Sequence, residues 1–167
     1  MTTLFSQPFD ALEVGDRFTT RGRTVTEADV HGFAGLTGDF HPQHTDEEWA
    51  SAGPFGGRIA HGLLVLSFAA GLVPFDPDRV MALRKVRDVV FKRPVRLGDT
   101  IRVEGKVAEL RPLDDTAGLV AVALNVTGAD AKTVMRATVE VLWRRDAVPA
   151  SNGAPAELPD ALTCVPL

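Results

Sequence analysis

The stretch from Gly38 to His44 places one carboxylate, Asp39, and two imidazoles, His41 and His44, around a single proline, Pro42. An imidazole can gain or lose a proton near neutral pH, and an ionised carboxylate can accept one from water. Pro42 disfavours helical angles at His41 and cannot continue a helix, so the stretch is predicted to be a loop. Asp39 and His44 are therefore predicted to form an acid–base pair. In the competing interpretation, Asp39 caps a helix or turn and His44 is an incidental polar residue.

A second group of interest begins an apolar segment, in the order Ile59-Ala60-His61-Gly62-Leu63-Leu64. The first amides of a helix lack intrahelical acceptors and carry partial positive charge. The Gly62 amide could therefore stabilise a carbonyl oxygen that gains negative charge, since glycine allows close approach to the backbone. Alternatively, Gly62 only permits tight packing and His61 is a buried histidine with its hydrogen bonds satisfied.

Other kinds of chemistry find less support in the sequence. Asp39, His41, His44 and Asp46 carry side chains that bind metal ions, but no second cluster lies at a recognised ligand spacing. Ser67 does not lie in a Gly-x-Ser-x-Gly turn, which argues against a serine nucleophile. We therefore expect neither a metal nor another cofactor.

The elements that must position these residues can be predicted from capping and periodicity. Thr26 is predicted to cap a helix that ends at Gly38, and the segment from Thr45 to Glu48 reads as a capping box that opens a short second helix through Ala50. The segment from Ile59 to Val73 is apolar almost all the way round, which is typical of a buried helix. We expect it to be the central helix of the domain.

The second half of the chain has the pattern of strands. Apolar and polar residues alternate over 101–107 and 135–143, residues 118–127 are rich in Val, Leu and Ala, turns are expected at 96–99, 112–118 and 128–131, and a short early strand is expected around 17–24. Early helices followed by consecutive strands predict an α+β fold in which the buried helix lies across a curved antiparallel sheet.

Length and charge limit the classes of protein. A chain of 167 residues suits one domain, predicted as residues 1–143 with an N-terminal arm, followed by a C-terminal tail at 144–167. The formal net charge of −4, without a long basic run, gives no support for a nucleic-acid or membrane partner. No apolar stretch reaches the roughly 20 residues that span a bilayer, and the first residues lack a leader pattern, so a cytoplasmic protein is expected.

The order Gly38-Asp39-x-x-Pro42-x-His44, followed by Ile59-Ala60-His61-Gly62-Leu63-Leu64, resembles the MaoC-like hydratases, which include the (R)-specific enoyl-CoA hydratases. The segment Phe91-Lys92-x-Pro94-Val95-x-x-Gly98-Asp99 extends the resemblance, which covers roughly residues 12 to 143. It implies a hot-dog fold and pairing of two such units, usually as a homodimer.

The resemblance also implies a reaction, the reversible syn addition of water to a trans-2-enoyl thioester, with acyl-CoA as the expected substrate. Asp39 and His44 would hold the water, with Asp39 as base and His44 as acid, and the Gly62 amide would hold the enolate oxygen. His41, Pro42, His61 and Leu63 would shape the substrate site, with His61 mainly structural. The family usually has Asn in place of His41, which leaves the acyl group open.

Three alternatives share these residues or this fold: a dehydratase acting on chains bound to a carrier protein, a non-catalytic acyl-binding subunit, and a thioesterase. The basic residues that could contact coenzyme A phosphates, or could simply be solvated, are Arg84, Lys85, Arg87, Lys92, Arg93 and Arg96.

Overall fold

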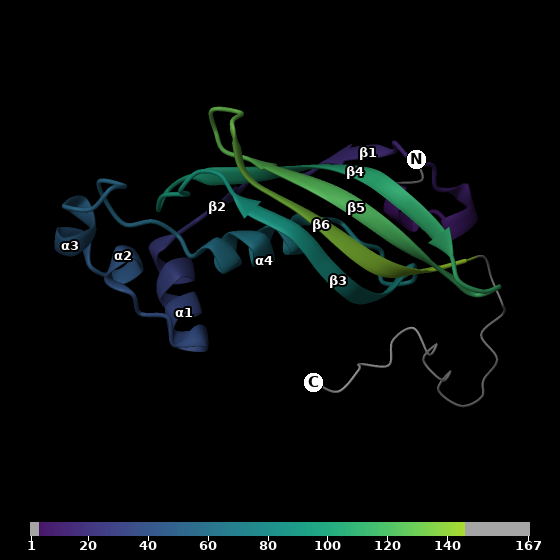
Figure 1. The fold of residues 1–167 in the computed structure, drawn as a ribbon, viewed down its shortest axis with the longest axis horizontal. Helices are drawn as coiled ribbons and strands as arrows, with labels where there is room; N and C mark the ends of the chain where they lie inside the picture. Colours follow the sequence, from purple (N-terminus) through teal and green to yellow (C-terminus); the bar gives the residue numbers. More distant parts are fainter. Residues whose placement is uncertain (1–3, 146–167) are drawn as a thin grey trace.

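The computed structural model describes residues 4–145, and Figure 1 shows an antiparallel sheet lying over one helix, α4. The strands are β1 (Arg17–Thr19), β2 (Arg23–Thr24), β3 (Val80–Phe91), β4 (Thr100–Pro112), β5 (Ala117–Thr127) and β6 (Thr133–Arg144). Their order is β1-β4-β5-β6-β3, and β2 pairs with β4 beside β1. The expected early strand is thus two short strands, and the three late strands and their turns lie where the alternation predicts them.

The helical elements are η1 (Leu4–Ser6), η2 (Phe9–Ala11), α1 (Glu27–Thr37), α2 (Pro42–Thr45), α3 (Glu47–Ser51) and α4 (Gly62–Leu72). Helices α1, α2 and α3 cluster at one end of the molecule, beyond the sheet (Figure 1). The start of α1 is the predicted one: the Thr26 side chain accepts from the Asp29 amide, and the Asp29 carboxylate accepts from the Thr26 amide. Its end at Gly38 is also the predicted one, with a left-handed φ of 78° that glycine adopts without strain.

The central helix α4 packs its buried residues, Leu64, Val65 and Ala69, against the inner face of the sheet. The prediction that this helix is buried on every side was wrong for the single chain, because Leu63 is 60% exposed on its opposite face. Apolar residues all round the helix therefore provide both a core face and an outward apolar face. The described residues contain no helix long and apolar enough to cross a membrane.

The prediction of one loop from Asp39 to His44 was wrong, because the loop ends at His41 and the helix α2 begins at Pro42. Proline is favoured at the first position of a helix, where its fixed φ is suitable and its missing N–H costs nothing. The next helix is capped by Asp46, whose carboxylate accepts from the Trp49 amide at 3.0 Å, rather than by the predicted Thr45. Both departures are local, and together they place His44 on a short rigid helix.

The N-terminal arm is part of the core. Phe5 and Phe9 are buried, and the Trp143 indole N–H donates to the Gln7 carbonyl at 2.9 Å. At the other end, Arg145 follows β6 and its guanidinium pairs with Asp10. The described fold runs from residue 4 to residue 145, and most of the predicted tail, 146–167, lies outside the described residues.

Candidate functional site

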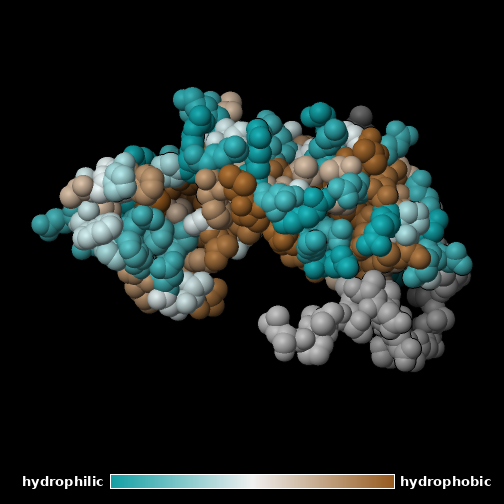
Figure 2. Space-filling model, in the orientation of Figure 1, coloured by the Kyte–Doolittle hydropathy of each residue, from teal (hydrophilic) through white to brown (hydrophobic). Residues whose placement is uncertain are grey.

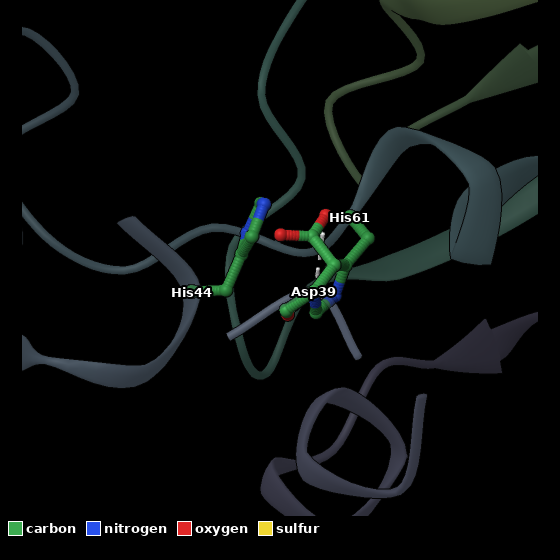
Figure 3. A group of neighbouring side chains, drawn as sticks. All are labelled: Asp39, His44 and His61. Carbon is green, nitrogen blue, oxygen red and sulfur yellow. Dashed lines mark hydrogen bonds and ion pairs between the residues drawn. The ribbon is translucent and has the colours of Figure 1, made fainter. Parts of the chain in front are cut away.

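The carboxylate of Asp39 and the ring of His44 meet where the helix cluster adjoins the start of α4. Asp39 lies in the turn after α1, and its carboxylate is turned toward the His44 ring in Figure 3. One side-chain atom from each of Asp39, His44 and His61 lies within 4.8 Å of the others. The structure therefore brings the two predicted acid–base residues together and adds His61 as a third member.

The state of His44 is set by one backbone hydrogen bond. Its Nδ1 lies 2.7 Å from the carbonyl oxygen of Ile59, which can only accept, so Nδ1 carries a proton and donates it. In the neutral ring Nε2 is then the bare acceptor. Burial lowers the pKa of His44 from its ordinary 6.5, and the His61 and His41 rings lower it too, while the Ile59 bond and Asp39 act in the opposite direction. A neutral imidazole with its lone pair at Nε2 can accept a proton from water.

His61 contacts both members of the pair. Its side chain is 2% exposed, and its Nε2 lies 2.9 Å from the backbone carbonyl oxygen of Asp39, so Nε2 must donate. Its ring stacks on the His44 ring, with centroids 3.8 Å apart and planes 26° apart. Among the described residues its Nδ1 has no hydrogen-bond partner. The interpretation of His61 as a fully satisfied buried histidine was therefore wrong for this nitrogen.

Three side chains that could ligate a metal are thus close, but their geometry does not suit one. An imidazole binds a metal along a lone pair in the plane of its ring. Because the His44 and His61 rings are stacked, their lone pairs lie in two separate, nearly parallel planes and do not readily meet at one point. His44 Nδ1 and His61 Nε2 are also engaged by carbonyl groups. The arrangement suits a hydrogen-bonded water better than a metal ion.

Gly62 is the first residue of α4, so its amide has no acceptor within the helix. It lines a pocket of about 290 Å³ whose walls are largely apolar and include Ile59, Val65, Phe91 and Val95. A Cβ added at Gly62 would come within 3.0–3.1 Å of the Phe91 ring. Glycine thus allows close packing against Phe91, in line with one interpretation of the sequence, and its position also leaves an amide at the edge of a pocket.

The remaining predicted substrate residues lie in different places. His41 is the N-cap of α2, where its Nδ1 accepts from the Gln43 amide at 3.1 Å and its ring packs edge-on against Trp49. Pro42 begins α2 and so shapes the site, whereas Leu63 is exposed and does not line the pocket at Gly62. An asparagine side-chain oxygen could accept the same hydrogen bond from the Gln43 amide. His41 can therefore replace the Asn that is usual at this position in the family that the sequence resembles.

Sequence reasoning missed Arg58, which ties the helix cluster to the segment before α4. Its two terminal nitrogens donate to the carboxylate of Glu27 at 2.7 and 2.8 Å, and its Nε donates to Glu47 at 3.0 Å. These bonds lower the pKa of both glutamates. The next residue, Ile59, supplies the carbonyl that orients His44. A lone arginine far in sequence from its partners gives no periodic or motif signal.

Comparisons with known proteins identify the family to which the chain belongs. The sequence model of the family described as MaoC like domain matches residues 10–129, more than half of the chain. The chain is 38% identical over 104 residues to a protein named 3-hydroxybutyryl-CoA dehydratase from Methylorubrum extorquens, covering 62% of this chain. That match spans 66% of the relative, just under two thirds of its length.

Two solved structures are similar in fold. The R-hydratase PhaJ1 from Pseudomonas aeruginosa aligns with a TM-score of 0.68 and 29% identity over 90% of this chain and 96% of that one. A Mycobacterium tuberculosis protein with a double hotdog fold aligns with a TM-score of 0.74 and 22% identity, over 92% of this chain and 53% of that one, and this likeness concerns the fold alone. The predicted hot-dog fold, with an antiparallel sheet around one central helix, is thereby confirmed. By its fold and by its family match, this chain belongs to the MaoC-like domain family.

Proposed function

We propose that this protein is a hydro-lyase that reversibly adds water to a trans-2-enoyl thioester and forms a (3R)-3-hydroxyacyl thioester. The observation that carries the proposal is the bare Nε2 of His44, which the Ile59 carbonyl holds beside the Asp39 carboxylate and whose ring stacks on His61, the residue before the amide that starts α4. Similarity to a named 3-hydroxybutyryl-CoA dehydratase and to an R-hydratase supports the same reaction class.

In the proposed reaction, His44 carries the proton. As the water oxygen attacks the β-carbon, its O–H bond breaks and the proton passes to Nε2. The imidazolium then returns a proton to the α-carbon on the same face, which gives syn addition and regenerates neutral His44. The Asp39 carboxylate accepts the second O–H of the water and stabilises the imidazolium, and the Gly62 amide holds the oxygen of the enolate. This division replaces the sequence-based one, in which His44 is the acid, because an acid would have to start protonated.

The assay for this function uses purified protein and crotonyl-CoA, with the loss of the conjugated thioester absorbance as the readout and the chirality of the product determined afterwards. The proposal expects hydration to the (3R) product without release of free thiol. Appearance of free thiol at the rate of absorbance loss would instead identify a thioesterase. A carrier-bound dehydratase would use the same three groups and differ only in the thioester handle.

The pH dependence of kcat/KM should distinguish the two assignments of His44. Burial lowers the pKa of His44 below 6.5. If neutral His44 is the base, the enzyme is active at pH values above this lowered pKa and loses activity as the pH falls below it. We expect full activity at neutral pH and an acid limb below 6.5. The unfolded chain binds more protons in this window, so stability also falls as pH falls from 6.5. Activity that declines as the pH rises from 6 to 7 would instead assign His44 as the acid.

We also propose that two copies pair through β3, the edge strand of the sheet. The edge carries exposed apolar side chains at Met81, Leu83, Val86 and Val90, and Figure 2 shows hydrophobic surface beside the place where Figure 1 draws β3 and α4. An exposed apolar edge strand is a template for pairing, and a two-fold interface uses each residue twice.

The pairing predicts the effect of Leu83→Lys on the oligomeric state. Leu83 is 57% exposed in the single chain, and burying a leucine is worth about 2 kcal/mol, so losing two copies should weaken a dimer roughly 1000-fold. Sedimentation should show a dimer for the wild type and a monomer for the variant. Leu36→Lys is the matched control, because Leu36 is 83% exposed on α1 and away from the edge. A wild-type monomer, or an intact Leu83→Lys dimer, would rule out this interface.

A further inference from the structure

The pocket beside Gly62 has two adjacent cations in its lining, Lys92 and Arg93, while its walls are largely apolar. Both residues lie just after β3, and both backbone amides donate to the Val134 carbonyl, at 2.8 and 3.2 Å. This pair of bonds fixes the backbone from which the two side chains extend. Both residues are exposed, so their charges are open to solvent and not buried in the pocket, and Lys92 also lines a second hollow together with Val90 and Arg136.

The opposite wall of the pocket is tied to the same segment. The Ala60 amide donates to the Val95 carbonyl at 2.8 Å, and Ile59 forms a bridge with Arg96. Residues 59–62, which supply the Ile59 carbonyl for His44 and the free Gly62 amide, therefore face the segment that carries the two cations. A substrate whose carbonyl lies at Gly62 must extend past that segment to leave the pocket.

Three other basic residues near β3 are already engaged, and a fourth, Lys85, is exposed on β3 but does not line this pocket. Arg84 pairs with Glu140, Arg87 pairs with Asp88 and Glu109, and Arg96 donates to the backbone carbonyls of Phe55 and Gly56. Lys92 and Arg93, by contrast, form no direct ion pair with a carboxylate within residues 4–145, although Arg93 lies near enough to Asp130 to add to the lowering of its pKa, which is due mainly to Lys132. Two unpaired cations at the opening of a largely apolar pocket are suited to a ligand that has an apolar reacting end and an anionic far end.

We propose that Lys92 and Arg93 bind the phosphate groups of the thioester handle. This inference rests on the proposed function. The pantetheine arm separates the thioester from its phosphates, so the phosphates must be held at the opening of the pocket while the carbonyl lies at the Gly62 amide. The same chemistry occurs in coenzyme A, which carries a diphosphate and a further phosphate, and in the phosphopantetheine of a carrier protein, which carries one.

The test compares crotonyl-CoA, crotonyl-phosphopantetheine on a carrier protein, and crotonyl-pantetheine, which has no phosphate. The variant is the double substitution Lys92→Ala with Arg93→Ala. Its matched control is Lys106→Ala with Arg111→Ala, two exposed cations of β4 that do not line this pocket. For a phosphate-bearing substrate we expect a KM about ten-fold higher in the variant, with kcat unchanged, because exposed charge pairs are individually weak. The crotonyl-pantetheine KM and the control should not change.

Ionic strength gives a second readout, because exposed charge pairs are screened by salt. Raising the salt concentration should raise the wild-type KM for crotonyl-CoA and leave that of the double variant nearly constant. A change confined to crotonyl-CoA assigns the site to coenzyme A, and a larger change for the carrier substrate assigns it to a carrier protein. Equal KM changes for crotonyl-pantetheine and crotonyl-CoA would overturn the proposal. Failure of the wild type to hydrate any of the three would overturn the proposed function itself.

Discussion

Asp39→Asn and His44→Asn should each lower kcat/KM for enoyl-thioester hydration by roughly 10²–10⁴-fold, the range expected for loss of one acid–base group. Asp39→Asn keeps the shape of the side chain and removes its charge. His44→Asn is chosen because an asparagine amide can still donate to the Ile59 carbonyl, which His44 Nδ1 now contacts at 2.7 Å, while it has no group in place of Nε2. The fall in kcat/KM would then be due to the missing Nε2 of His44 and not to a lost hydrogen bond with the Ile59 carbonyl.

The double variant should be little worse than either single variant, because the two groups act on one water molecule and their effects are not additive. Glu48→Gln is the matched control, since it removes one exposed carboxylate charge from the same helix cluster. The melting temperatures should stay within a few degrees of the wild type. Folded variants of both residues that keep wild-type kcat/KM would remove the pair from the mechanism.

Structural features that depend on residues close together in the sequence could be predicted from it. The Thr26 cap, the Gly38 stop and the alternation in β6 depend on residues a few positions apart, and the structure matches them. The prediction of a loop around Pro42 was wrong because proline can either end a helix or begin one. The hydrogen bond made by the N-cap His41 shows that Pro42 begins one here. The same difficulty explains why His44 was placed on a loop.

Other features depend on contacts between distant residues, which leave no periodic pattern. In the sequence, Phe5 and Phe9 have no periodic spacing and belong to the predicted N-terminal arm, yet both are buried in the core. The edge strand β3 lacks clean alternation because its register shifts between Arg87 and Val90, where Asp88 has a positive φ of 56°. The Asp39 and His44 pair could be proposed from the motif, whereas its link to the Ile59 carbonyl and to Arg58 required the fold.

His61 joins the two halves of the candidate site and is the second residue whose substitution should be costly. It donates from Nε2 to the Asp39 carbonyl at 2.9 Å and stacks on the His44 ring at 3.8 Å. We expect it to act as a positioning residue that fixes the distance between the carboxylate and the imidazole. Its two contacts can be removed one at a time.

His61→Gln keeps a donor that can reach the Asp39 carbonyl but loses the stacked ring. His61→Phe keeps an aromatic ring against His44 but leaves the part-buried Asp39 carbonyl without its donor. We expect each variant to lower kcat by roughly 10–100-fold, the equivalent of about 1.4–2.8 kcal/mol, with little change in KM. His31→Gln is the matched control, because His31 is exposed on α1 and, among residues 4–145, its polar partner is Glu27, away from Asp39 and His44.

The pH profile separates positioning from simple structural support. Burial is the main cause of the lowered pKa of His44, and the charge of the His61 imidazole adds to it, so both variants, which remove that charge, should raise the pKa and move the acid limb toward 6.5. Loss of packing alone would lower the melting temperature and leave the acid limb in place. If both variants fold, keep the wild-type kcat and show an unshifted acid limb, His61 does not position Asp39 and His44 relative to each other. If the limb moves and kcat falls, His61 adds to the effect of burial that keeps His44 neutral, and it holds Asp39 in position beside it.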